Sequence, residues 1–166
     1  GGAALYYYIK GGRLQQAMEG LKYRNRPDIG LELGRFYGML LRDHDPYRQA
    51  QLILPVPLHP KRKAQRGYNQ SAMVAKGLFE SMGIPFREDL LVRKKETNSQ
   101  TEKNRMDRVV NMQSAFELKK PELLKNLHLL LVDDILTTGA TLEACARLLT
   151  RVEGTRISLV TLAMTK

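Results

Sequence analysis

Two adjacent carboxylates and a threonine-rich turn form the segment best suited to chemistry. Asp133 and Asp134 follow the apolar run Leu129–Val132. The pattern predicts that both aspartates terminate a buried strand, where carboxylates without partners would be costly. Carboxylates accept hydrogen bonds from paired sugar hydroxyls and attract hard cations such as Mg²⁺. This end of the segment therefore suits a sugar or a metal ion.

The residues after the aspartates suit an anion. Thr137, Thr138, Gly139, Ala140 and Thr141 lead into a predicted helix. Gly139 permits a tight backbone, and the free N–H groups and dipole of a helix start favour a negative charge. The threonine hydroxyls add further donors. A sugar end and a phosphate end within a few residues suit a ribose 5-phosphate.

Each of these residues alone also fits a structural role. Asp134 or Thr137 can organise a turn, and Thr138 or Thr141 can cap a helix. The ordered set is more specific than its members. It contains neither the Gly-Lys-Ser/Thr of a Walker loop nor the Gly-x-Gly-x-x-Gly of a dinucleotide site.

The elements that position this segment alternate along the chain. Strand patterns occur at 4–9, 51–56, 89–92, 114–118, 127–132 and 156–164, and helix patterns at 14–21, 27–41, 69–82 and 142–152. This order predicts an α/β fold, a mostly parallel sheet with helices on both faces. Ligands of such sheets bind at the carboxyl ends of the strands. On the helix at 27–41, the expected inner face is Ile29, Leu33, Phe36, Tyr37, Leu40 and Leu41.

Two polar segments are predicted to lack regular structure. Residues 57–68 read as a long polar loop, and 93–108 as a mobile loop or a loosely held helix. In the first, Arg66-Gly67 allows close approach to an anion. For 61–63 a solvated basic loop is an equally good interpretation, whereas Arg66, Asn69 and Gln70 favour a functional role.

Composition limits the class of protein. The 166 residues fit a single domain, 1–166, and a net charge of +10 favours anionic partners such as phosphorylated small molecules, nucleic acid or an acidic protein. Cys145 stands alone, which excludes an internal disulfide and predicts a small core residue. No apolar run approaches a membrane span, so the default expectation is a cytoplasmic protein without membrane insertion.

Residues 129–141 resemble the signature with which type I phosphoribosyltransferases bind phosphoribosyl pyrophosphate (PRPP). The resemblance implies that Asp133 and Asp134 hold the ribose hydroxyls and that Thr137, Thr138, Gly139, Ala140 and Thr141 cradle the 5-phosphate. It also implies Mg²⁺, bound with PRPP through the two aspartates. A core over 49–166 would follow a small N-terminal hood over 1–48, where Tyr23 is a candidate for stacking on a base.

The rest of the chain looks like the ComF (GntX-type) branch of this family. The motifs are Pro-Val-Pro-Leu at 55–58, Arg-Gly-Tyr-Asn-Gln at 66–70, Leu-Lys-Tyr at 21–23, and the pattern Arg93, Asn98, Gln100, Arg105, Asn111, Ala115-Phe116. By analogy, pyrophosphate would be held by Pro57, Leu58, His59, Arg66, Gln100 and Arg105. The Cys-x-x-Cys zinc module that often precedes the tyrosine-rich strand in relatives is not part of this sequence.

Two functions follow from these expectations. The first is a phosphoribosyltransferase in which Asp133, Asp134 and Arg66 act in transfer to a nitrogen nucleophile with release of pyrophosphate. The acceptor and the general base are not identified. The alternative is a non-catalytic sensor of PRPP or a nucleotide that binds single-stranded DNA or a competence-machinery protein through its basic surface.

Overall fold

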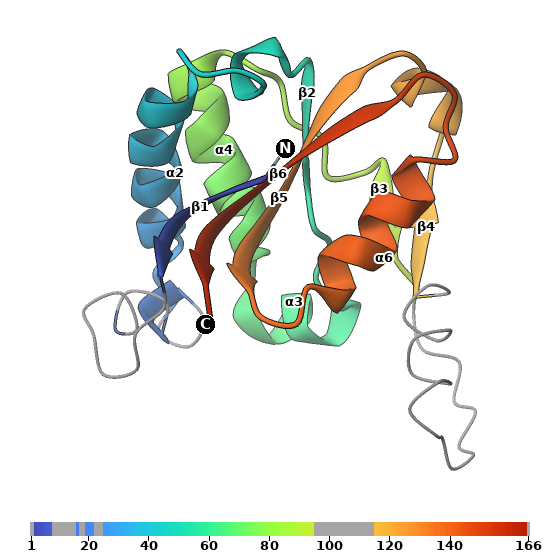
Figure 1. The fold of residues 1–166 in the computed structure, drawn as a ribbon. Helices are drawn as coiled ribbons and strands as arrows, with labels where there is room; N and C mark the ends of the chain where they lie inside the picture. Colours follow the sequence, from blue (N-terminus) through green and yellow to red (C-terminus); the bar gives the residue numbers. More distant parts are fainter. Residues whose placement is uncertain (1, 8–15, 17–18, 22–24, 95–114, 166) are drawn as a thin grey trace.

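A parallel sheet of four strands forms the centre of the computed structural model, which describes residues 2–7, 16, 19–21, 25–94 and 115–165 (Figure 1). Its strand order is β1-β6-β5-β2, and every neighbouring pair is parallel. The strands are β1 (Gly2–Tyr7), β2 (Leu52–Pro55), β5 (His128–Leu136) and β6 (Arg156–Met164). The predicted α/β fold with a mostly parallel sheet is confirmed.

Helices cover both faces of this sheet. Helices α2 (Pro27–Leu41) and α4 (Gln70–Met82) lie on one face, and α6 (Ala140–Leu149) lies on the other (Figure 1). Strand β5 alternates between two cores: Leu130 and Val132 pack on the α2 and α4 side, and Leu129 and Leu131 on the α6 side. A continuous apolar run fits this position because both faces of the strand are buried.

Two predicted strands do not join the parallel sheet. Strands β3 (Leu91–Arg93) and β4 (Phe116–Leu118) pair antiparallel as a separate ribbon. The outer edge of β2 is already occupied, because Ile53 exchanges backbone hydrogen bonds with Pro85 and Arg87. Short 3₁₀ turns, η1 (Tyr47–Gln49) and η2 (Pro121–Leu124), complete the connections.

The prediction that Asp133 and Asp134 terminate their strand is wrong. Strand β5 continues to Leu136, with Asp133 opposite Thr161 and Leu136 opposite Met164 of β6. The strand continues because β6 runs alongside it, and because Ile135 and Leu136 pack on opposite cores. The two carboxylates are therefore held on a hydrogen-bonded strand rather than on a loop.

The inner face of α2 also differs from the prediction. Tyr37 and Leu41 are buried as expected, but Phe36 and Leu40 are exposed. Their place is taken by Gly30, Gly34 and Gly38, a stripe with a spacing of four residues, all three of which are buried.

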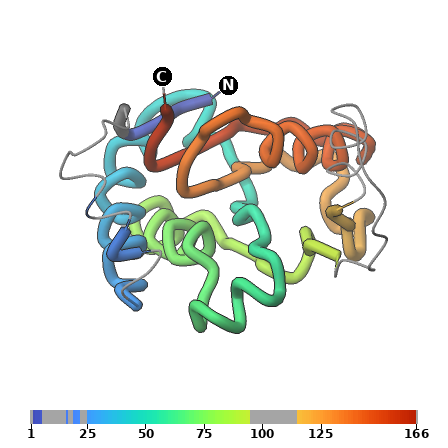
Figure 2. Tube along the Cα trace, turned by 90° about the horizontal axis from the view of Figure 1, so that it is seen from below, coloured from blue at the N-terminus to red at the C-terminus, as the bar shows by residue number. Residues whose placement is uncertain are grey.

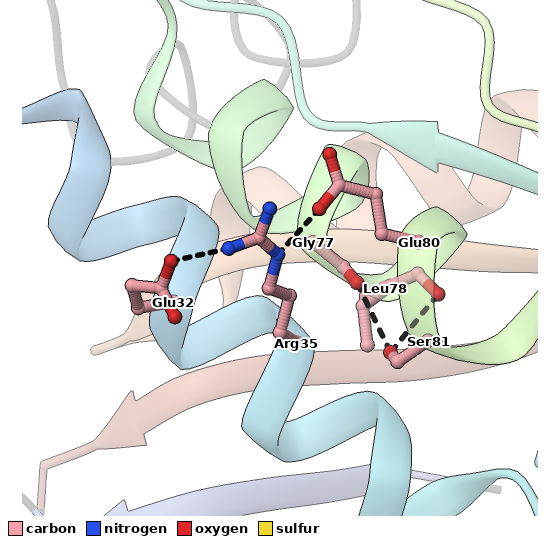
Figure 3. A network of polar contacts seen from close by, with 6 residues as sticks. All are labelled: Glu32, Arg35, Gly77, Leu78, Glu80 and Ser81. Atoms are coloured by element: carbon pink, nitrogen blue, oxygen red, sulfur yellow. Dashed lines mark hydrogen bonds and ion pairs between the residues drawn. The ribbon is translucent and has the colours of Figure 1, made fainter.

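Glycine lets α2 lie directly against α4. A Cβ atom built on Gly34 would lie 2.4 Å from the carbonyl oxygen of Val74, and one on Gly77 would lie 2.2 Å from that of Leu31. Figure 3 shows the polar rim of this contact, where Arg35 of α2 bridges Glu32 and Glu80. The two backbones therefore approach as closely as main-chain atoms permit.

The segment predicted as a polar loop at 57–68 contains a helix, α3 (Pro60–Arg66). Pro60 occupies its first turn, the His59 side chain accepts a hydrogen bond from the Lys61 amide, and Gly67 ends it at φ 79°. None of its residues is buried. Its sequence therefore shows no regular spacing of apolar residues. Only the residues at its two ends indicate a helix.

The N-terminal segment contributes to the same sheet and helix layer. β1 is an edge strand beside β6, and α2 packs on α4. Residues 22–24, where the sequence predicts the centre of the hood, lie outside the described residues. The hood and its Tyr23 therefore stay a prediction.

Candidate functional site

The turn from β5 to α6 lies at the carboxyl end of the parallel sheet, as do α3 and the start of α4 (Figure 1). Figure 2 looks onto this end of the molecule. Asp133 and Asp134 lie among the last residues of β5, 137–139 form this turn, and 140–141 begin α6. Residues 57–66 follow the carboxyl end of β2. The fold thus brings the two predicted parts of the site to one end of the sheet.

Asp133 is held by hydrogen bonds from two sides. The Ser71 hydroxyl donates to its Oδ1 at 2.9 Å, and the Asp134 amide donates to the same oxygen at 2.9 Å. Ser71 is the second residue of α4, and Asp133 follows Val132, the residue of β5 opposite the last residue of β2. One carboxylate oxygen is therefore fixed within the protein.

Burial and a neighbouring charge disfavour ionisation of Asp133. Burial is the larger cause and the Asp134 carboxylate the second, and together they raise the pKa of Asp133 from 3.8 to about 7. The hydrogen bonds from the Asp134 amide and from Ser71 act in the opposite direction. Near neutral pH this carboxyl can hold or release a proton.

Asp134 lies next to it and is half-buried. Its Oδ1 accepts a hydrogen bond of 2.8 Å from the Ile135 amide. Across the sheet, Thr161 is the register partner of Asp133 and is 2% exposed. Among the described residues its Oγ1 has no hydrogen-bond partner. Polar groups thus gather on β5 and β6 where both strands near their ends.

The threonine turn leads into α6 through a glycine in the left-handed region. Gly139 has φ 77° and stands at the N-cap, so no side chain caps α6. Thr137 and Thr138 are exposed, and only a long contact of 3.5 Å joins the Ala140 amide to Thr138 Oγ1. The first amides of α6 and the exposed hydroxyls are thus arranged as an anion site requires.

A cavity of about 450 Å³ lies beside the exit of β2. Two residues of the predicted pyrophosphate set, Pro57 and Leu58, line it, as do Lys63 and Arg93. Arg93, on β3, also lies with its guanidinium carbon 5.4 Å from the ring centroid of Phe116. The cavity therefore combines a proline-rich wall with two cationic side chains and one carboxylate, that of Glu88, which pairs with Lys63 at 3.6 Å.

The other members of the pyrophosphate set are placed differently. His59 caps α3 through Nδ1, and its Nε2 is buried without a partner among the described residues. Arg66 is the last residue of α3. Gln100 and Arg105 lie outside the described residues. Their predicted contacts with pyrophosphate stay predictions.

A larger cavity, of about 820 Å³, lies elsewhere. It is formed by β4, η2 and the end of α6, with Phe116, Leu148 and Val152 in its wall. None of the predicted site residues lines it. The larger of these two cavities is therefore not lined by Asp133 or Asp134.

The described residues contain neither a protein-only metal cluster nor a membrane-spanning helix. Within that part of the chain, no three His, Cys, Asp or Glu residues cluster as a protein-only metal site would require. No described helix is both long and apolar enough to cross a bilayer. Two adjacent carboxylates still fit Mg²⁺ when a phosphate ligand completes its shell, the usual mode for this ion.

Sequence reasoning missed Ser71 and left Arg93 without a role. Ser71 lies 62 positions from Asp133, so no local pattern signals their contact. Asn69 and Gln70, predicted to be functional, are both buried. Asn69 caps α4 through the Ser71 amide and donates to the Val56 carbonyl at 2.9 Å, which is a structural role.

Comparison with known proteins identifies the class. Residues 68–166 match the family pattern described as "Phosphoribosyl transferase domain". The chain therefore belongs to the phosphoribosyltransferase family. Glutamine PRPP amidotransferase from B. subtilis shares the fold, with a TM-score of 0.59 at 16% identity over 87% of this chain and 30% of that one.

Curated relatives place the chain with ComF-type members, which confirms the predicted resemblance. "Competence protein F" of Haemophilus influenzae is 34% identical over 136 residues, 79% of this chain and 59% of that protein. "DNA utilization protein YhgH" of Escherichia coli is 32% identical over 79% of this chain and 58% of its own length. "Competence protein ComFC" of Streptococcus pneumoniae is 32% identical over 81% and 57%. The chain thus spans somewhat over half the length of these relatives.

Proposed function

We propose that this chain binds PRPP, with Mg²⁺, at the turn between β5 and α6. The observation that carries the proposal is the order of groups along this turn. Asp133 and Asp134 lie on the end of β5, and the amides of α6 begin at Ala140, after an exposed threonine pair. The carboxylates would accept from the ribose hydroxyls, and the helix start would hold the 5-phosphate.

The reaction that suits this arrangement is transfer of the phosphoribosyl group to a nitrogen nucleophile. The C–O bond at ribose C1 breaks, the C–N bond forms, and pyrophosphate leaves with the bonding electron pair. Arg66 and the cations beside the β2 exit, Lys63 and Arg93, would stabilise the departing charge. Asp133 and Asp134 would orient the sugar and stabilise positive charge near C1.

Mg²⁺ fits the proposal as a ligand shared with PRPP, held by the Asp133 and Asp134 carboxylates and screening the negative charge of pyrophosphate. A carboxyl pKa of about 7 at Asp133 means that cation binding would compete with a proton. We therefore expect Mg²⁺-dependent binding to strengthen as pH rises through 7.

Thermal unfolding with separate ligands tests the proposal. PRPP with Mg²⁺ at about a hundredfold excess over Kd should raise the unfolding temperature by about 5–10 °C. Ribose 5-phosphate should give a smaller rise in the unfolding temperature. A rise with pyrophosphate alone should show binding at the β2 exit. A panel of bases and amines, screened for pyrophosphate release, then tests turnover. No response to either PRPP or ribose 5-phosphate would exclude the proposed site.

A second candidate function rests on charge. The net charge of +10, together with relatives named for competence and DNA utilization, favours single-stranded DNA as a partner. Lys61, Arg62 and Lys63 form an exposed basic run on α3. Helix α3 lies at the same end of the sheet as the turn from β5 to α6 (Figure 1).

Salt dependence separates this candidate from the first. If α3 contacts the phosphate backbone, replacing Lys61 and Arg62 by glutamine should weaken DNA binding and reduce the slope of log K against log salt by about 1.4. Lys63 is left unchanged because it lines the cavity at the β2 exit. The response to PRPP should be kept. If parent and variant bound DNA equally well, α3 would not be part of the DNA interface.

A further inference from the structure

Three successive polar residues at the start of α4 are almost completely buried. Asn69, Gln70 and Ser71 are 6%, 3% and 4% exposed. Buried polar groups persist in folded proteins when they are hydrogen-bonded, because leaving them unpaired is costly. The partners of the Asn69 and Ser71 side chains therefore indicate why these two positions are polar.

The hydrogen bonds form a chain across three elements. The Asn69 side-chain amide donates to the Val56 carbonyl at 2.9 Å, and its Oδ1 accepts from the Ser71 amide at 3.2 Å. The Ser71 hydroxyl then donates to Asp133 Oδ1 at 2.9 Å. Val56 itself donates its amide to the Val132 carbonyl at 2.8 Å.

This series of hydrogen bonds joins the two ends of the proposed site. Val56 directly precedes Pro57 and Leu58, which line the cavity at the β2 exit, and Asp133 belongs to the proposed ribose end. A carbonyl, an amide side chain, a hydroxyl and a carboxylate are thereby held in a fixed order. Such a network restricts the rotamers of every side chain in it.

We propose that Asn69 and Ser71 are positioning residues that fix the carboxyl group of Asp133 and couple it to the exit of β2. The inference rests on the proposed function, since Asp133 matters only if the turn binds a ribose phosphate. In this proposal Ser71 acts on the ligand only through Asp133. It holds one oxygen of Asp133, together with the Asp134 amide, so that the plane of the carboxyl is set before the ligand arrives.

Ser81 provides a matched control on the same helix. Its hydroxyl donates only to the carbonyls of Gly77 and Leu78 within α4 (Figure 3). Ser71→Ala and Ser81→Ala therefore remove the same atom from α4, and only the first removes a contact with β5. Ser71→Thr keeps the hydroxyl and serves as the conservative variant.

Titration of PRPP with Mg²⁺ into each variant tests the inference. Ser71→Ala should weaken PRPP binding about tenfold, because a hydrogen bond to a carboxylate is lost. Ser81→Ala should bind like the parent, and Ser71→Thr should recover most of the affinity. Asn69→Ser, which keeps a capping hydroxyl but loses the donor to Val56, should also weaken binding.

A double-mutant cycle shows whether Ser71 acts through Asp133. Adding Ser71→Ala to Asp133→Asn should change the remaining affinity less than twofold. An equal tenfold loss in that background, or parent-like binding by Ser71→Ala alone, would overturn the inference and leave the proposed function intact. A parent protein that does not bind PRPP would overturn both.

Discussion

Ser71 and Asp133 meet across 62 positions of sequence, and their hydrogen bond of 2.9 Å joins the start of α4 to the end of β5. The register of β2 with β5 ends at Pro55 opposite Val132, one residue before Asp133. The Ser71 contact places a hydroxyl against a carboxyl whose pKa is raised to about 7, mainly by burial. Asp133 thus bears on the stability of the protein and, under the proposed function, on ligand binding.

The raised pKa of Asp133 has a consequence for stability. Between pH 4 and 7 the folded protein keeps a proton that the unfolded chain releases, since the unfolded carboxyl has a pKa near 3.8. Stability from this group therefore falls as pH rises through that window. Asp133→Asn removes the charge and keeps an oxygen for Ser71. We expect the variant to be more stable than the parent at pH 8 by about 1–2 kcal/mol.

Urea unfolding of both proteins at several pH values measures this difference. The advantage of Asp133→Asn should shrink as the pH falls toward 4, because the folded parent then keeps its proton and the unfolded carboxyl becomes partly protonated too. If the free energies of unfolding of the two proteins differed by the same amount at every pH from 4 to 8, the raised pKa of Asp133 would be contradicted. A stabilised variant that no longer responds to PRPP would show that the fold carries this carboxylate for binding.

A second prediction concerns the contact between α2 and α4. Gly34→Ala would normally favour a helix by about 1 kcal/mol. Here the new Cβ would lie 2.4 Å from the Val74 carbonyl oxygen, so the helices must separate. We expect a net loss of about 2 kcal/mol, seen as a fall of about 4–8 °C in the unfolding temperature.

Glu32→Ala, on the exposed side of the same helix, is the control for that variant. It breaks only the surface ion pair with Arg35 and should change stability by less than about 1 kcal/mol. A Gly34→Ala variant that is as stable as the parent, or more stable, would contradict the close packing of α2 on α4.

A third prediction concerns Cys145. The thiol is buried on α6, and burial and the Asp133 charge both raise its pKa. Little thiolate forms at pH 8, and reagents do not reach it. Modification by a disulfide reagent should therefore be at least about a hundredfold slower in the native protein than in urea. Rapid native reaction would show that α6 does not pack as described.

Much of the fold was accessible from local patterns. The run Leu129–Val132 predicted a strand buried on both faces, and β6 was predicted with its observed bounds, 156–164. Helices α2 and α6 were predicted from the spacing of apolar residues, α2 also from Pro27 at its start, and α4 was predicted over 69–82. These elements carry their signals in residues adjacent in sequence.

Most of the misses depend on a partner that is distant in sequence, and α3 is the exception. β5 extends past Asp133 because β6 runs beside it. The buried face of α2 is glycine because α4 presses against it, and glycine contributes nothing to an apolar pattern. α3 buries no residue and shows only end signals. Ser71 acquires its meaning from a carboxylate on another strand.

The central claim is that Asp133 and Asp134 bind the ribose of PRPP. Calorimetric titration of PRPP with Mg²⁺ into the parent and the Asp133→Asn, Asp134→Asn double variant tests it most directly, with Glu122→Gln, an exposed residue on η2, as control. Tight binding by the parent and by Glu122→Gln, with at least about a hundredfold loss in the double variant, is the predicted result. Undiminished binding by the double variant would contradict the claim.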